Sequence, residues 1–161
     1  MDLSDFEPAV HQLADALRAR GWRLATAESC TGGLIAAACT AAAGSSDWFE
    51  RGFVTYSNAA KTQLLGVPAA LIAAHGAVSE AVVRAMALGA LQHAPVQLAV
   101  AVTGIAGPGG AVPGKPVGTV WLGLAGPQGV QAGLLQLGGD RSAVRAATVA
   151  AALQRLIRAA A

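Results

Sequence analysis

Residues 96–104, VQLAVAVTG, limit the fold more than any other segment of the chain. They form an almost continuous apolar run of small and β-branched side chains that ends at a glycine. A run of this kind is typical of a strand that is buried on both faces. The segment therefore predicts the central strand of a sheet.

Helical and strand-like patterns alternate along the rest of the chain. Helices are expected over residues 5–20, 32–42, 58–65, 78–94 and 141–160, with caps at Gly21, Ser57 or Asn58, Ser79 and Asp140. Further strands are expected over 23–28, 51–57, 118–126 and 130–137, the last two joined as a hairpin by Pro127-Gln128-Gly129. This order predicts an α/β fold, a three-layer α/β/α sandwich with a mixed sheet, as a single domain over residues 1–161.

Composition excludes several classes of protein. Apolar residues make up 54% of the chain and charged residues 12%, which argues against disorder, and the net charge of +2 gives no basis for nucleic-acid binding. No apolar run reaches about 18 residues, so we expect no membrane span. Cys30 and Cys39 have no metal or redox spacing, which predicts no metal and a reducing, cytoplasmic location. The alanine-rich surface favours a homo-oligomer.

Polar, small-residue sequences follow three of the expected strands. They are Glu28-Ser29-Cys30-Thr31-Gly32-Gly33, Tyr56-Ser57-Asn58, and Thr103-Gly104 with the residues up to Pro108. Ligands of open α/β sheets bind beyond the carboxyl ends of the strands, so we expect these segments to meet at one site. The glycine- and proline-rich segment 104–118 is interpreted as a loop of that site.

Ser29 is the first candidate nucleophile, because it lies on an expected strand-to-helix turn. Gly32 and Gly33 would allow a ligand to approach the backbone, and the amides near Thr31 could hold an oxyanion. Two alternatives remain at this stage. Ser29 or Thr31 could simply cap the helix, and Cys30 could be the nucleophile if the helix N-terminus lowered its pKa.

Lys61 is the preferred base for Ser29. It lies in the first turn of an expected helix, where the dipole disfavours a positive charge by only about 0.3–1 kcal/mol. Lowering its pKa enough for base catalysis takes roughly 3–5 kcal/mol, so burial must supply most of the change. An exposed surface lysine is the alternative, and a Ser29-His75-Asp47 triad is a weaker one.

Several other side chains are candidates for the same site. Tyr56 could relay a proton between Ser29 and Lys61 or bind substrate. Glu28 would raise the pKa of Lys61 if the two were paired, so we expect its partner to be an arginine or a backbone amide.

Two arginines at the start of the last expected helix are candidates to bind a negatively charged group of a substrate. Arg141 and Arg145, four residues apart on one helical face, suit a phosphate or carboxylate, although a solvated basic face is the alternative. Lys115 could also approach a phosphate. Asn58, Thr103 and Gly104 complete the expected substrate site.

The chain closely resembles the nicotinamide-nucleotide amidohydrolases, the family that includes the C-terminal domain of the competence/damage-inducible protein CinA. The resemblance runs from about Leu13 to Leu156. It is carried by the ordered blocks TAESCTGG, GSSDWFERGFVTYSNAAK, LLGV, HGAVSE, TGIAGPGG, KPVGTVW and GDR. The chain is too short for the extra N-terminal domain of the long CinA form.

The resemblance implies a serine amidohydrolase that uses a Ser-Lys pair, with Ser29 as nucleophile and Lys61 as general base. It implies supporting roles for Tyr56 and Thr103 and a substrate contact for Arg145. The implied substrate is nicotinamide mononucleotide, which would be converted to nicotinate mononucleotide and ammonia without a cofactor. Two other hypotheses remain open: a nucleotide-binding module without turnover, and a thiol enzyme that uses Cys30.

Overall fold

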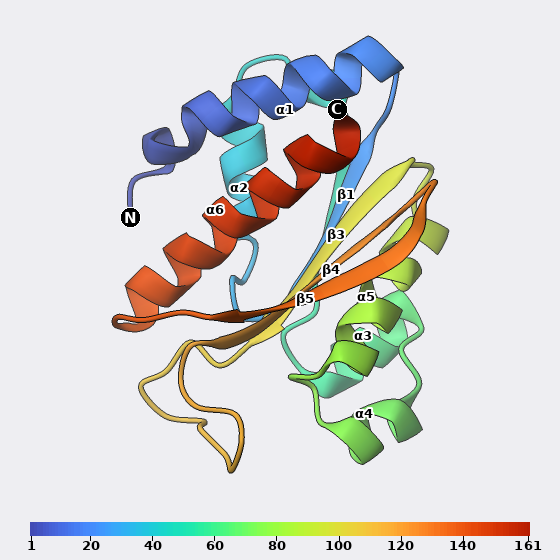
Figure 1. The fold of residues 1–161 in the computed structure, drawn as a ribbon. Helices are drawn as coiled ribbons and strands as arrows, with labels where there is room; N and C mark the ends of the chain where they lie inside the picture. The colour runs from blue at the N-terminus through green and yellow to red at the C-terminus, as the bar shows by residue number, and fades with distance from the viewer.

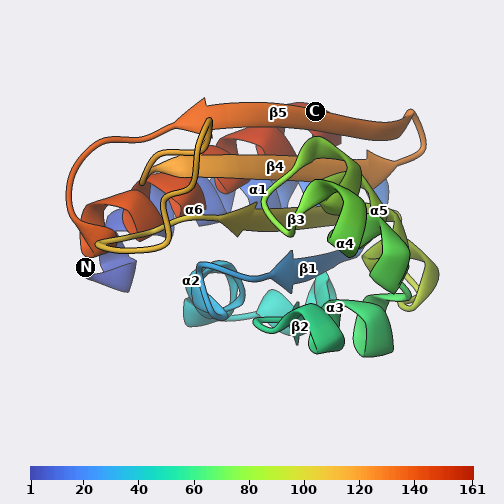
Figure 2. The same cartoon turned by 90° about the horizontal axis from the view of Figure 1, so that it is seen from below.

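The computed structural model describes all 161 residues and contains one five-stranded sheet. The strand order is β2-β1-β3-β4-β5, as Figure 2 shows from below. Three neighbouring strands run parallel: β2 (Phe49–Val54), β1 (Leu24–Glu28) and β3 (Leu98–Gly104). The sheet continues with a hairpin, in which β4 (Thr119–Gly126) pairs antiparallel with β3 and β5 (Gly129–Gln136) pairs antiparallel with β4. The sheet is therefore mixed, as predicted.

Helices cover both faces of this sheet (Figure 1). One layer contains α1 (Glu7–Arg20), α2 (Leu34–Ala41) and α6 (Arg141–Ala160), and the other contains α3 (Asn58–Leu65), α4 (Ala69–His75) and α5 (Glu80–Gln92). Short 3₁₀ turns lie at Leu3–Phe6 and Ser45–Asp47. Each layer packs on the sheet through its own buried apolar cluster, which confirms the three-layer sandwich. No helix combines the length and the apolar character needed to cross a membrane.

The expected caps are confirmed. Gly21 ends α1 with a left-handed φ of 63°. The side chains of Ser57, Ser79 and Asp140 each accept a hydrogen bond from an amide in the first turn of α3, α5 and α6, respectively. These caps fix where the helices start, and the start of α3 sets the position of Lys61.

Two boundaries beside the site and one additional helix differ from the sequence-based expectations. The strand expected over 51–57 is β2 at Phe49–Val54, so Tyr56 lies beyond the strand rather than within it. The helix expected from residue 32 begins at Leu34, because the two preceding glycines have positive φ. Helix α4 was not expected, and His75 is its last residue rather than part of a turn.

The connections after β1 and β2 leave the sheet toward opposite faces. The chain passes from β1 into α2, in the layer with α1 and α6, whereas it passes from β2 into α3, which contacts α5. A crevice forms between neighbouring strands whose connections diverge in this way. The expected site segments lie at that crevice.

Candidate functional site

A pocket of about 220 Å³ lies at the carboxyl ends of the parallel strands. It combines residues from all three segments that the sequence singled out. The lining residues are Ser29, Cys30, Tyr56, Asn58, Lys61, Ala77, Val78, Thr103, Gly104, Ala106 and Arg141. The predicted meeting of the three strand ends is therefore present in the structure.

Ser29 directly follows β1 and opens the turn into α2. Its amide donates to the carbonyl of Val102 on β3 (3.1 Å), and its carbonyl accepts from the amide of Gly32 (3.0 Å). Gly32 and Gly33 have φ values of 60° and 102°, which side-chain-bearing residues rarely adopt. These bonds and the two glycines hold the Ser29 hydroxyl at the pocket instead of continuing the strand.

Glu28, rather than a hydroxyl side chain, caps the start of α2. Its carboxylate is fully buried and accepts from the amides of Ile35 (2.8 Å) and Ala36 (3.0 Å) and from the hydroxyl of Thr31 (2.6 Å). The backbone-amide partner expected for Glu28 is thus confirmed. The alternative in which Ser29 or Thr31 caps the helix is wrong, because neither side chain accepts from a helix amide.

Glu28→Gln is expected to destabilise the protein by about 2 kcal/mol, since one acceptor oxygen becomes an NH₂ group that faces buried donors. Urea unfolding followed by circular dichroism measures this change. Glu80→Gln is the matched control, because Glu80 is exposed on α5 and pairs only with Arg84. An equal effect of both substitutions would contradict the capping role of Glu28.

Three amides of the Ser29 turn remain unused. The N–H groups of Cys30, Thr31 and Gly33 donate no hydrogen bond within the chain. Unpaired amides at a helix start favour an anion or a developing oxyanion.

Lys61 lies on the buried face of α3, one turn before Leu65. Its side chain is only 1% exposed. The Nζ atom is 3.0 Å from Ser29 Oγ, 3.0 Å from the carbonyl oxygen of Thr55 and 3.2 Å from that of Tyr56. No carboxylate forms an ion pair with Lys61. The alternative of an exposed surface lysine is therefore wrong.

Burial lowers the pKa of the Lys61 amine, and the nearby Cys30 opposes this shift only in part. A neutral amine has two N–H donors and one lone pair. Two backbone carbonyls are available for the donors, which leaves the lone pair for the hydroxyl of Ser29. The surroundings of Lys61 thus fit a base that removes a proton from Ser29.

The alternative nucleophile and the alternative base have less suitable surroundings. Burial raises the pKa of the Cys30 thiol to about 11, so the reactive thiolate is scarce at neutral pH. Asp47 forms an ion pair with Arg18 (3.5 Å), and His75 ends α4 without contacting Ser29. The structure does not assemble the Ser29-His75-Asp47 triad.

The backbone and the side chain of Tyr56 contact different residues of the site. The carbonyl contacts Lys61, whereas the largely exposed phenol accepts a hydrogen bond from Arg141 (3.1 Å). Ser29 and Lys61 are in direct contact, so no phenol lies between them. The proton relay suggested for Tyr56 is absent from this geometry, and the substrate-binding alternative is the one that fits.

The side chains of the two arginines at the start of α6 make different contacts. Arg141 lines the pocket and also donates to the carbonyl of Gly107 (2.8 Å), which ties the loop of residues 105–117 to the pocket entrance. Arg145 instead donates to the carbonyl of Thr31 (3.0 Å), behind the turn, and its buried Nε has no partner. Of the two arginines, Arg141 is the one that lines the pocket.

Three of the remaining candidate residues line the pocket, and the three candidates of the Ser29 turn do not. Asn58, Thr103 and Gly104 line it, and the hydroxyl of Thr103 donates to the carbonyl of Ala77 (3.0 Å). The side chain of Thr31 and the two glycines of the turn do not line it.

Lys115 also lies outside the pocket. Its ammonium group donates to the carbonyl of His75 (3.1 Å) at the end of α4. The phosphate contact suggested for Lys115 is therefore not supported by this arrangement.

Sequence reasoning missed the carbonyls of Thr55 and Tyr56 as partners of Lys61, and the contributions of Ala77, Val78 and Ala106 to the pocket wall. Backbone acceptors and small apolar residues carry no local signal. The HGAVSE block, which contains Ala77 and Val78, was noted only as part of the family resemblance.

The chain is similar to several known proteins over most of its length. The model of the CinA C-terminal domain family matches residues 7–160. The nicotinamide-nucleotide amidohydrolase PncC of Enterobacter agglomerans is 54% identical over 157 residues, which cover 94% of this chain and 96% of that protein. The protein of the same name from Escherichia coli is 54% identical over 148 residues, covering 90% and 88%. The crystal structure of competence/damage inducible protein CihA from Agrobacterium tumefaciens superposes with a TM-score of 0.93 at 46% identity, covering 96% and 94%.

Proposed function

Because the chain belongs to the CinA C-terminal domain family, we propose that it is a nicotinamide-nucleotide amidohydrolase. It converts nicotinamide mononucleotide and water to nicotinate mononucleotide and ammonia, a reaction that recycles pyridine nucleotides. The observation that carries the proposal is the buried Lys61 amine, 3.0 Å from the hydroxyl of Ser29 and without a carboxylate partner.

In the first half of the reaction, the Oγ of Ser29 attacks the carboxamide carbon while the neutral amine of Lys61 accepts the hydroxyl proton. The carbonyl oxygen becomes an oxyanion. The unpaired amide of Cys30, which lines the pocket, is the donor for this charge, at the start of α2 where the helix dipole favours an anion.

In the second half, the protonated Lys61 returns its proton to the amide nitrogen, and the carbon–nitrogen bond breaks to release ammonia. The acyl group stays on Ser29 as an ester. A water molecule then loses a proton to Lys61 and attacks the ester, which frees the carboxylate and restores the hydroxyl of Ser29. The balance is one amide and one water to one carboxylic acid and one ammonia, so the reaction needs no cofactor.

Arg141 and Tyr56 hold the rest of the substrate at the entrance of the pocket. The guanidinium group of Arg141 is already in contact with two oxygens, from Tyr56 and Gly107. A substrate phosphate is a stronger acceptor than either of these neutral oxygens. We propose that the phosphate takes their place and that Asn58 and Thr103 contact the remaining polar groups.

Release of ammonia from nicotinamide mononucleotide tests the proposal directly. A coupled ammonia assay, together with chromatography of the nucleotide, should give one equivalent each of ammonia and nicotinate mononucleotide. Tight nucleotide binding in calorimetry without any product would instead identify a binding module.

Cys30→Ala is expected to retain kcat/KM within about threefold, because only the amide of Cys30 serves the reaction and a thiol with a pKa of about 11 stays protonated. Ammonia release measures this, and pretreatment of the unmodified protein with iodoacetamide is the companion experiment. Loss of activity in both experiments would favour the thiol mechanism.

We also propose that the enzyme works in the cytoplasm as a homo-oligomer. Both cysteines are free and buried, which suits a reducing compartment. Val54, Leu64 and Leu134 are large apolar side chains exposed on the surface. Sedimentation velocity measures the assembly state, and a single species with the mass of one chain would contradict the oligomer.

A further inference from the structure

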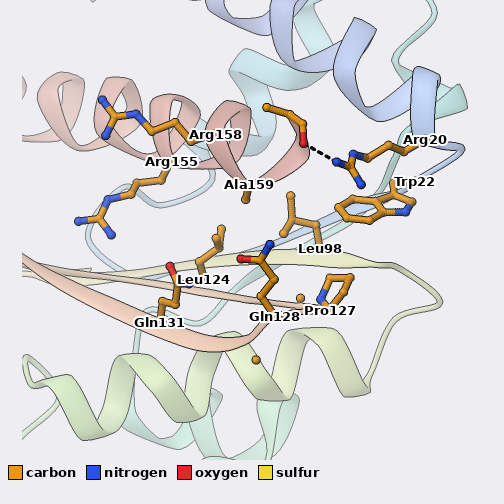
Figure 3. Close-up of a pocket in the computed structure, with 13 residues that line it drawn as sticks. Arg20, Trp22, Leu98, Leu124, Pro127, Gln128, Gln131, Arg155, Arg158 and Ala159 are labelled. Atoms are coloured by element: carbon orange, nitrogen blue, oxygen red, sulfur yellow. Dashed lines mark hydrogen bonds between the residues drawn. The ribbon is translucent and has the colours of Figure 1, made fainter.

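A second cavity, of about 480 Å³, lies at the other end of the sheet from Ser29 (Figure 3). Strand β3 begins at Leu98, which lines this cavity, and ends at Gly104, which lines the Ser29 pocket. The volume falls in the range of small-molecule sites. The cavity is formed by the end of α1, the hairpin of β4 and β5, and the last turns of α6.

The charged side chains of this cavity are all positive. Arg20, Arg155 and Arg158 line it, and no Asp or Glu does. Arg20 donates to the carbonyls of Ala160 and Ala161, so its guanidinium group is hydrogen-bonded to the end of α6. Arg155 and Arg158 form no ion pair with any carboxylate of the chain.

Helix ends explain only part of this positive charge. Helices α1 and α6 both end at the cavity, and each C-terminus carries a partial charge of about −0.5. Arg20 lies in the last turn of α1 and Arg158 in the last turn of α6, so both are placed to offset these partial charges. Arg155 lies before the last turn of α6, so its charge exceeds what the helix ends need.

The two ends of the cavity differ in chemistry (Figure 3). The indole of Trp22 and the ring of Pro127 lie at one end, and Arg155 and Arg158 lie at the other. The guanidinium group of Arg155 lies against Gly133 of β5. At one end the cavity thus offers the indole of Trp22, with the guanidinium group of Arg20 over its ring at 4.6 Å, and at the other end two arginines without an ion pair.

We propose that this second cavity binds a nucleotide-like anion, whose planar base lies beside Trp22 and whose phosphate lies at Arg155 and Arg158. The base gains from contact with the indole, and guanidinium groups are the preferred partners of phosphate. The site is separate from the Ser29 pocket and does not depend on the function proposed there.

Calorimetric titration with AMP and with inorganic pyrophosphate tests this site. Arg155→Gln/Arg158→Gln should weaken the binding of both anions at least tenfold, as expected from the loss of about 1.5–3 kcal/mol per charged hydrogen bond. Trp22→Ala should weaken the binding of AMP but leave the binding of pyrophosphate unchanged. The control Arg18→Gln/Arg84→Gln removes the same formal charge outside the cavity and should bind both anions like the unmodified protein.

Arg141 gives the catalytic pocket a cation of its own, so Arg141→Gln is titrated in parallel. The proposal requires that Arg141→Gln retains AMP binding at the second cavity. It also requires that Arg155→Gln/Arg158→Gln releases ammonia from nicotinamide mononucleotide at the unmodified rate when AMP is absent. AMP binding that disappears in Arg141→Gln but survives the double substitution would overturn the proposal, and so would binding that the control pair weakens equally.

Discussion

Ser29→Ala is expected to lower kcat for ammonia release roughly 10⁶-fold, close to the loss seen when a serine hydrolase loses its nucleophile. No other hydroxyl contacts the amine of Lys61, so nothing replaces the attacking group. Steady-state ammonia assays measure the loss. The substrate should still bind, because the groups at the pocket entrance are untouched.

Ser46→Ala is the matched control, since Ser46 is an exposed hydroxyl in the short turn before β2. It should leave kcat unchanged. Mass spectrometry of the unmodified protein, quenched during turnover, should find the acyl group on the peptide that contains Ser29. Near-normal turnover by Ser29→Ala would remove Ser29 from the mechanism.

Lys61→Met is expected to lower kcat about 10³-fold, the usual contribution of a general base. Methionine keeps much of the buried volume but cannot accept the proton of Ser29. In the unmodified enzyme, kcat/KM should rise with pH as Lys61 loses its proton, because only the neutral amine is a base. Burial lowers the pKa of Lys61, so this rise should occur at a lower pH than for an ordinary lysine at about 10.4.

Lys115→Met is the control for this substitution, since Lys115 is the only other lysine and lies outside the pocket. It should leave both kcat and the pH profile unchanged. If Lys61→Met kept the same rise of kcat/KM with pH, another group would have to be the base. Circular dichroism must show that both variants remain folded.

The sequence was sufficient to predict the layers of the fold and the pairing of Ser29 with Lys61. Parallel strands place their carboxyl ends at one edge, so the turn at Ser29 and the segment after β2 had to lie near each other. Burial of Lys61 was expected only if this lysine is the base, because of the energy needed to lower its pKa, and an exposed lysine remained the alternative. The Ser-Lys pair itself was also implied by the family resemblance.

Other features depend on three-dimensional detail that local patterns do not contain. Glu28 caps α2 through amides seven and eight residues further along the chain, where sequence reasoning favoured a hydroxyl cap. The direction of the phenol of Tyr56 depends on Arg141, 85 residues away. Helix α4 has seven residues, too short for its own periodicity to indicate a helix, and packing against α5 stabilises it.

The second cavity had no sequence signal for the same reason. Arg20, Gln128 and Arg155 belong to three separate elements, and each one alone is an ordinary surface residue. Only the approach of the ends of α1 and α6 to the hairpin brings them together. A cluster of this kind is visible only in the folded chain.

The protonation of Lys61 can be measured directly, because the chain has only two lysines. Lysine labelled with ¹³C at Cε gives two NMR signals, and Lys115→Arg assigns the one from Lys61. The mechanism predicts that the signal of Lys61 titrates at a pH below the ordinary lysine value of about 10.4. A titration of Lys61 at or above the ordinary lysine value of about 10.4 would contradict its role as the base for Ser29.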